Sequence, residues 1–267
     1  MTVATQLERD WQRFTPLKRL SRFAFYLFAA LALVISLRTI DVIPEFLYDA
    51  PDQMTDLFKR MWPPDPSYIR PTLQGLIETL HIATLGTIIA IGLAVPIGLL
   101  AARNVTPNFA LNLFAKFVFV TSRSINSLVW ALLFVAIFGP GPLAGTLAIA
   151  FRSIGFTGKL FAEAMEEANA GSIEALTAAG ASRSSTLLLG YWPQIRPAFW
   201  SIALFRWDIN IRESAVLGIV GAGGVGVALD TALNLLYWDQ VAVVLIAIFA
   251  VVVLAEIVVT SVRARLL

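Results

Sequence analysis

Long apolar runs separated by short polar segments dominate this chain. A helix needs about 20 apolar residues to cross a bilayer, and six stretches have roughly that length and character. The sequence therefore predicts an all-α, polytopic membrane protein with about six transmembrane helices, at residues 22–40, 76–102, 112–138, 143–162, 196–220 and 241–262.

Composition supports lipid as the solvent of this protein. Of its 267 residues 58% are hydrophobic and 14% charged, and the mean hydropathy is +0.76. Soluble domains carry about 45–50% apolar and about 25% charged residues. The net charge of +2 comes from scattered basic residues, which does not indicate a nucleic-acid surface. The chain has no cysteine and a single histidine, His81, which cannot form a zinc site alone.

Charge in the polar segments predicts how the chain crosses the membrane. The first run, from Phe23 to Ile40, is longer than the apolar part of a signal peptide, about 7–15 residues, so we predict a retained helix at 22–40. Basic residues gather in the tail 1–21, in the central polar segment and at the C-terminus, whereas 41–75 is acidic and rich in proline. The positive-inside rule then places both termini in the cytoplasm, 41–75 outside as a loop or short surface helices, and a core domain at 76–267.

A polar interruption at about 166–193 separates the fourth and fifth runs. Its residues form helices readily, with Ser172 as a candidate N-cap and Gly180 as a C-terminal stop before Pro193. Ile173, Leu176 and Thr177 fall on one helical face, whereas Glu174 points elsewhere. This pattern suits a short cytoplasmic helix that lodges in a groove of a soluble partner. An amphipathic helix lying on the bilayer is the alternative.

Several charged or amide side chains lie inside the predicted fifth span, where a charge costs at least roughly 2.5–3.5 kcal/mol at the bilayer centre. They must therefore face protein or water. Asp208 and Arg212 are spaced to pair along a helix, and a second face carries Arg206, Asn210 and Glu213. Two functions remain open, internal ion pairs that lock the helix in place, or a polar path for an oxyanion, which the planar guanidinium binds well.

Two neighbouring runs contain further arginines. Arg123, with Asn126 close by, lies well inside the predicted third span, and we expect it to pair with Glu213 or Asp208. Arg152 lies inside the fourth span. Each arginine suits either a pathway or a buried ion pair.

A glycine-rich stretch follows the fifth run. Gly221, Gly223 and Gly226 match the dinucleotide fingerprint, but a span precedes them where that fold needs a strand. With Gly224, they instead predict a hinge or close helix packing, whose backbone N–H groups could also receive an anion. The chain contains no GxxxxGK[ST] phosphate-binding loop. A membrane enzyme using Glu78, His81, Asp208 and Glu213 is the alternative function.

The central interruption resembles the coupling signature of bacterial ATP-binding cassette (ABC) importer permeases. Glu174-Ala175-Leu176, Gly180 and Trp192-Pro193 keep its spacings, with Leu176, Gly190 and Trp192 as departures. The segments 139–145, 159–164, 205–214 and 216–226 are similar to the phosphonate-type permeases, and the resemblance covers about residues 70–267.

This resemblance implies a type I ABC importer permease fold with a cytoplasmic coupling helix, in the bacterial inner membrane. It implies a homodimer, a dimer of ATP-binding subunits that hold ATP and Mg, and a periplasmic or lipid-anchored phosphonate-binding protein, with no cofactor and no nucleic acid on this chain. Glu174, Ala175, Leu176, Gly180 and Pro193 would then contact the ATPase, and the four glycines of 221–226 would form a gate or hinge. The cargo would be a phosphonate, phosphite or phosphate. The expected pathway residues are Arg123, Asn126, Arg152, Arg206, Asp208, Asn210, Arg212 and Glu213.

Overall fold

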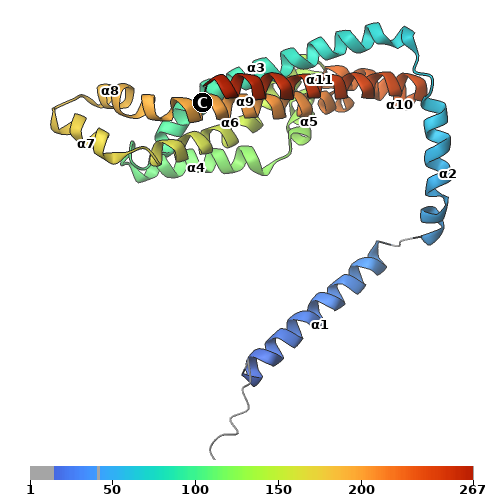
Figure 1. Ribbon diagram of the computed structural model, residues 1–267, viewed down its shortest axis with the longest axis horizontal. Helices are drawn as coiled ribbons and strands as arrows, with labels where there is room; N and C mark the ends of the chain where they lie inside the picture. The colour runs from blue at the N-terminus through green and yellow to red at the C-terminus, as the bar shows by residue number, and fades with distance from the viewer. Residues whose placement is uncertain (1–14, 41–42, 267) are drawn as a thin grey trace, which may run out of the picture. The chain divides into compact units, whose positions relative to one another are not determined.

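The computed structural model describes residues 15–40 and 43–266, and every regular element in these two ranges is a helix (Figure 1). The chain divides into two compact units, Met1–Asp56 and Leu57–Leu267, and the second is called the core unit here. The all-α prediction is confirmed.

The first unit contains α1, Pro16–Thr39, a helix of 24 residues. At about 1.5 Å per residue it is about 36 Å long, enough to cross the hydrocarbon layer. Pro16 is the first residue of the helix, where a missing N–H has no intrahelical partner to lose. The helix therefore starts inside the predicted tail 1–21, most of which lies outside the described residues.

The predicted outer loop is largely helical. The second helix, α2, covers Pro44–Met61, with Glu45 in its first turn and Lys59 and Arg60 in its last, which suits the helix dipole. It ends where the run Trp62 to Pro66 begins, as expected from the proline density there. A short 3-10 turn, η1 (Pro66–Tyr68), then leads into the next helix, which starts at Ile69 rather than at residue 76.

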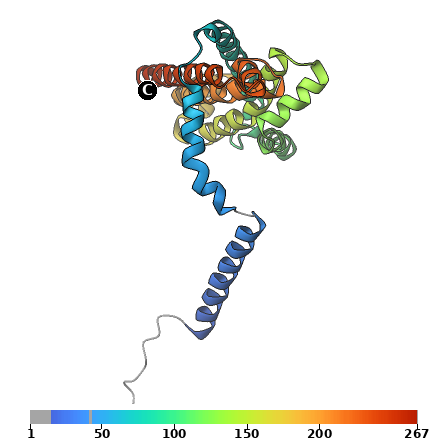
Figure 2. The ribbon, with the colours of Figure 1, turned by 90° about the vertical axis from the view of Figure 1, so that its right-hand side faces the viewer.

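The core unit is a bundle of long helices with short ones at both ends (Figures 1 and 2). Its central pair is α3 (Ile69–Ala101) and α6 (Pro142–Glu166), which make the most extensive contact between elements. Small residues allow this approach, because a Cβ on Gly86 would lie 2.7 Å from the Ile149 side chain. Around this pair lie α4 (Phe109–Ser124), α5 (Ser127–Phe138), α7 (Ala170–Ala178), α8 (Arg183–Ser185), η2 (Thr186–Tyr191), α9 (Trp192–Leu217), η3 (Gly218–Val220), α10 (Val225–Asn234) and α11 (Trp238–Leu266).

The predicted third span is two helices rather than one. α4 and α5 meet at an angle of 93°. Asn126 causes the break, since it is extended and its side chain accepts a hydrogen bond from the Leu128 N–H at 3.1 Å as the N-cap of α5.

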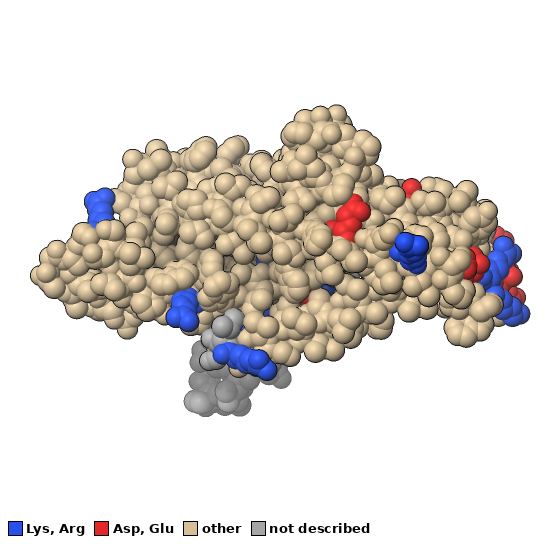
Figure 3. All heavy atoms as spheres, turned by 90° about the horizontal axis from the view of Figure 1, so that it is seen from above, with Lys and Arg blue, Asp and Glu red and all other residues tan. Residues whose placement is uncertain are grey.

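By length and composition, the described part contains three helices able to cross a membrane, or up to five if α4–α5 and the bent segment Arg183–Asn234 each count as one span. Six were predicted. The difference includes α6, which has 25 residues but falls outside that count. Much of α6 is buried inside the bundle, so its surroundings are protein and it does not need a strongly apolar surface. The face in Figure 3 is mostly uncharged, with charged side chains at a few separate places.

The two ends of the core unit differ in character (Figure 1). At one end, here called the α7 end, lie α7, α8 and the loop between α3 and α4. At the other, here called the glycine end, lie the loop 221–224, α10 and the turn 139–141. Polar side chains between the two ends form the candidate site.

Candidate functional site

Two arginines from different helices converge on one carboxylate inside the core unit. Arg152 of α6 lies 3.1 Å from Glu213 of α9, and Arg206, about two turns earlier on α9, lies 3.5 Å from the same carboxylate. The side chain of Arg206 is 4% exposed, that of Glu213 17% and that of Arg152 28%. Arg152, Arg206 and Glu213 are here called the charged cluster. With two guanidinium groups and one carboxylate, it carries one formal positive charge in excess.

A hydrogen-bond relay fixes the cluster to α3 and α6. Arg206 Nε donates to Ser153 Oγ at 2.9 Å, and Ser153 donates to Asn210 Oδ1 at 3.1 Å. Asn210 Nδ2 then donates to Thr87 Oγ1 at 2.8 Å. Ser153, Asn210 and Thr87 are all buried. Because each donor has an acceptor, the relay holds the Arg206 side chain in place, and Arg206 also lies 5.6 Å from the ring centre of Phe156.

These contacts confirm that Arg206, Asn210 and Glu213 share one face of α9 and bring Arg152 to it. Sequence reasoning missed Ser153 and Thr87, because single hydroxyl residues in an apolar run are common and give no signal. The cluster is chemically suited to an oxyanion, since Arg152 is partly accessible and a guanidinium binds two oxygens side by side.

A separate ion pair lies on another face of α9. Arg212 contacts Asp208, as predicted from their spacing, and also lies 2.7 Å from Glu256 of α11. Asp208 is nearly buried, and its Oδ1 atom has no hydrogen-bond partner in the described part of the chain. Glu256 was not among the predicted residues, although a single acid inside the last apolar run is a usable signal. The Arg212–Glu256 contact joins α9 to α11, and no ion pair among the described residues links Asp208 or Arg212 to the charged cluster.

The prediction that Arg123 pairs with Glu213 or Asp208 is wrong. Glu213 and Asp208 are paired with other arginines, and no ion pair among the described residues includes Arg123. Its side chain is exposed and lines a cavity between α4 and α6. Asn126 is the N-cap of α5 and is exposed rather than part of the charged cluster.

The central polar segment contains α7, but its caps differ from the prediction. Asn169 caps α7 by accepting a hydrogen bond from the Gly171 N–H at 2.8 Å, so Ser172 is not the N-cap. Gly180 does end the helix, with φ at +80°, and the N–H of Ala181 bonds the carbonyl of Leu176 at 3.0 Å. This is a Schellman ending, which favours glycine at the left-handed position.

The apolar stripe of α7 faces its own chain. Ile173 packs against the core, and Leu176 lies against Gly190 of η2, where a Cβ would come within 3.1 Å of it. Ile173 and Leu176 are therefore half-buried against their own chain, whereas Thr177 is exposed. Docking of this face on a partner stays a prediction. The exposed side of α7 instead presents Glu174 and Ala175.

A π-helical segment connects α7 to the long helix α9. This segment, η2, ends at Tyr191, and Pro193 lies in the first turn of α9. Gln194 accepts a hydrogen bond from the Asn169 N–H at 2.8 Å and donates one to the Gly190 carbonyl at 2.8 Å. These two hydrogen bonds join the cap of α7 to the start of the helix that carries Arg206 and Glu213.

The glycine loop is close-packed. Gly221, Gly223 and Gly224 have φ of +78°, +83° and +79°, and a Cβ on Gly226 would lie 2.6 Å from the Ala215 carbonyl oxygen. Glu78 accepts the Gly224 N–H at 3.1 Å and Thr79 the Val225 N–H at 2.8 Å. These two N–H groups already have partners within the chain, so they are not free to receive an anion as considered above.

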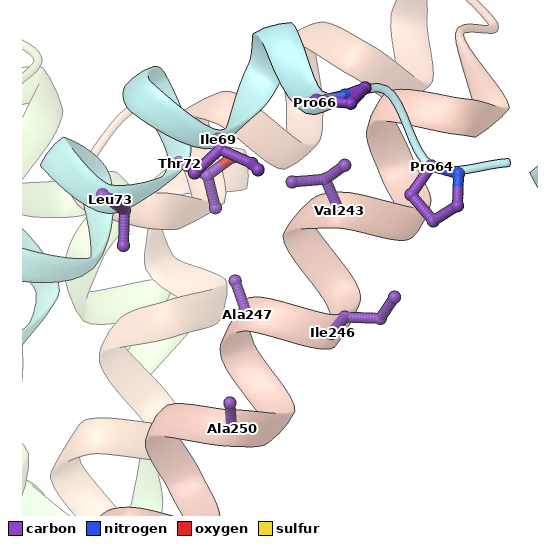
Figure 4. A pocket seen from close by; sticks show the side chains of 9 residues that line it. All are labelled: Pro64, Pro66, Ile69, Thr72, Leu73, Val243, Ile246, Ala247 and Ala250. Carbon is purple, nitrogen blue, oxygen red and sulfur yellow. The ribbon is translucent and has the colours of Figure 1, made fainter.

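Another cavity, of about 270 Å³, lies between the start of α3 and the start of α11 (Figure 4). Its lining is apolar except for the Thr72 hydroxyl, which donates to the Tyr68 carbonyl. With no charged lining residue, this cavity is unsuited to an oxyanion.

A bundle of long apolar helices with an internal charged cluster and a short helix at one end is an arrangement suited to a transport permease. Residues 94–266 match the family of binding-protein-dependent transport system inner membrane components, and the chain belongs to this family. It is therefore an inner-membrane component of an ABC-type transport system.

Two curated relatives are similar to this chain in sequence. The chain is 39% identical over 239 residues to the phosphate-import permease protein PhnE of Mycolicibacterium smegmatis, covering 88% of this chain but 44% of that protein. It is 41% identical over 193 residues to the putative phosphite transport system permease protein HtxC of Stutzerimonas stutzeri, covering 72% of this chain and 68% of the relative. The chain thus spans less than half of the first relative's length.

Solved structures agree on the fold. An inward-facing form of the MetNI methionine ABC transporter matches with a TM-score of 0.67 at 20% identity, over 76% of this chain and 99% of the matched chain. A crystal structure of an amino acid ABC transporter with histidines matches with a TM-score of 0.63 at 19% identity, over 74% and 95%. The predicted type I importer permease fold is confirmed.

Proposed function

We propose that this chain is the membrane-spanning subunit of an importer that moves a phosphonate, phosphite or phosphate ion into the cytoplasm. The charged cluster is the observation that carries this proposal. It is held inside the bundle, carries an excess positive charge and leaves Arg152 partly accessible. The names of the relatives, which concern phosphate and phosphite, agree with this chemistry.

The cluster suits transient binding of a doubly or singly charged oxyanion. Hydrogen bonds to charged groups contribute about 1.5–3 kcal/mol each. Glu213 competes with the anion for both arginines, so it lowers the affinity and allows release. A carrier needs this balance, because tight binding would hold its cargo in the path.

The α7 end is proposed to face the cytoplasm. Arg103, Lys116 and Arg183 lie toward this end, and α11 finishes there with Arg263 and Arg265. By the positive-inside rule, the α7 end and both termini are then cytoplasmic. The glycine end would meet a periplasmic or lipid-anchored binding protein.

A separate ATP-binding subunit is proposed to supply the energy, since the sequence contains no phosphate-binding loop. It would hold ATP and Mg and contact the exposed side of α7 at Glu174 and Ala175. Leu176, Gly180 and Pro193 would support that surface from behind by packing, by ending α7 and by starting α9. Two copies of the chain would form the path between them.

Transport is then a mechanical relay. Nucleotide binding brings the two ATPase subunits together and moves α7, and the Asn169–Gln194 contact moves α9 with it. Because α9 carries Arg206 and Glu213, the cluster changes its exposure from one side of the membrane to the other.

Uptake by vesicles tests this function. Vesicles holding the chain, its ATP-binding subunit and its binding protein should accumulate labelled phosphonate, phosphite or phosphate when ATP is supplied on the α7 side. Sulfate of equal concentration serves as the control anion. Accumulation that does not depend on ATP, or that is equal for sulfate, would rule the proposal out.

A further inference from the structure

A second group of cations lies away from the charged cluster, in a cavity of about 400 Å³ between the end of α3, α4 and α6. Six charged side chains line this cavity, which is here called the basic cavity: Arg103, Lys116, Arg123, Lys159, Glu163 and Glu166. Four of them are cationic and two are anionic. None belongs to the Arg152–Glu213–Arg206 group.

Both carboxylates of the basic cavity already have partners. Glu163 lies 3.1 Å from Lys159, and Glu166 accepts a hydrogen bond from the Arg103 backbone N–H at 2.9 Å. In the described part of the chain, no ion pair includes Lys116, Arg123 or the Arg103 guanidinium. With four cations and two carboxylates in its lining, the cavity carries an excess of two formal positive charges.

These cations are accessible from the cavity, because Arg103 and Arg123 are exposed and Lys116 is half-buried. Lys116 and Arg123 are about two turns apart on α4, on the same side of a helix that is otherwise largely apolar. Within a bilayer, a lysine or arginine faces water, an acid or an anion, because lipid chains do not solvate it. An anion in the basic cavity would meet this requirement.

Apolar side chains and close helix packing bound the basic cavity. Phe119 and Ala162 close its apolar side, and Gly155 allows α4 to approach α6, since a Cβ there would lie 2.5 Å from the Phe119 carbonyl oxygen. Lysine and arginine together are the residues that bind phosphate groups. We infer that the basic cavity is a second binding site, for a phosphate or phosphonate group, with Lys116 and Arg123 as its main ligands.

Two sources have this chemistry, a free oxyanion and the headgroup of an acidic phospholipid. A two-arm binding experiment on the full-length chain separates them. In the first arm, equilibrium dialysis in lipid-depleted detergent measures binding of labelled phosphate and methylphosphonate. In the second, native mass spectrometry counts the phosphatidylglycerol molecules retained, against phosphatidylcholine as the neutral competitor.

The test variant is K116Q/R123Q, and the matched control is R183Q/R196Q, which loses the same charge outside the cavity. We expect at least ten-fold weaker binding for the test variant in one arm and no more than a two-fold change for the control. Loss in the first arm identifies a free oxyanion, and loss in the second identifies a lipid headgroup. K116R/R123K should retain binding, which separates lost charge from lost folding.

Arg152→Gln tells this site apart from the charged cluster, because that variant should keep the binding that K116Q/R123Q loses. The inference fails if neither ligand binds, or if K116Q/R123Q binds both as well as the wild type does. It also fails if Arg152→Gln abolishes the same binding. Import by the wild-type complex is measured separately, so failure here leaves the proposed function standing.

Discussion

Gln194, in the first turn of α9, accepts a hydrogen bond from the backbone N–H of Asn169, which caps α7, at 2.8 Å. This contact joins the proposed ATPase-facing helix directly to the helix that carries the charged cluster. The segment η2, which precedes α9, is π-helical, and such segments are often found at functional sites.

Gln194→Ala should uncouple ATP hydrolysis from transport. A neutral hydrogen bond contributes about 1 kcal/mol, which corresponds to about a five-fold change. We therefore expect about five-fold less substrate imported per ATP hydrolysed, measured in vesicles by paired uptake and phosphate-release assays. Gln194→Glu keeps the acceptor for the Asn169 N–H but loses the donor to the Gly190 carbonyl, so better coupling in Gln194→Glu than in Gln194→Ala would assign the effect to the Asn169 contact. Equal coupling in both variants would show that this contact does not transmit the motion.

Glu213→Gln should destabilise the bundle. The change leaves two guanidinium groups without their carboxylate, and breaking a buried pair costs about 3–5 kcal/mol. Glu163→Gln is the control, because its pair with Lys159 is half exposed and such pairs contribute about 0–1 kcal/mol. Denaturant unfolding in detergent measures both. A loss for Glu213→Gln no larger than that of the control would contradict the buried-pair account.

Arg212→Gln should lower stability without changing transport by the folded complex. The substitution leaves Asp208, which is nearly buried, without its cation. Because the contacts of Arg212 with Asp208 and Glu256 are separate from the charged cluster, uptake per assembled complex should stay within about two-fold of wild type. Assembled protein is quantified beside uptake. Arg265→Gln, at the exposed end of α11, is the control. A selective loss of uptake at normal assembly would instead place Arg212 on the path.

Gly145→Ala should disturb the glycine end. A Cβ at this position would lie 2.3 Å from the Ala222 carbonyl oxygen, and overpacking costs about 1–3 kcal/mol. Gly92→Ala is matched to it, since a Cβ there meets nothing within 4 Å and alanine favours a helix. Thermal unfolding in detergent should show a lower midpoint for Gly145→Ala only. Equal midpoints would mean that the glycine end adapts to the added methyl group.

The sequence predicted the helical class, the position of α7 and the two charged faces of α9. Hydrophobic runs and the spacing of Asp208 and Arg212 carry this information locally. The Gly180 ending of α7 was also predictable, because a left-handed position favours glycine.

What failed depended on contacts between distant segments. The predicted partner of Arg123 was wrong because the sequence does not show which arginine lies beside which acid of α9. Only the packing of α6 on α9 places Arg152 beside Glu213. The helix break at Asn126 was also missed, because a cap inside an apolar run gives little signal, and its place on the pathway stays a prediction. The sequence also did not show that Ile173 and Leu176 of α7 pack partly against their own chain. Periodicity shows that a face is apolar without showing what covers it.

The most direct measurement compares ATP-dependent uptake of phosphate, phosphite and phosphonate by wild type and by Arg152→Gln in vesicles with both partner proteins. Arg152 is the more accessible cation of the charged cluster, so its loss should raise the substrate concentration for half-maximal uptake or reduce uptake by about ten-fold or more, while the complex still assembles and hydrolyses ATP. Arg196→Gln, outside the cluster, should transport like wild type. Full uptake of all three anions by assembled Arg152→Gln would contradict an oxyanion path through the Arg152–Glu213–Arg206 cluster.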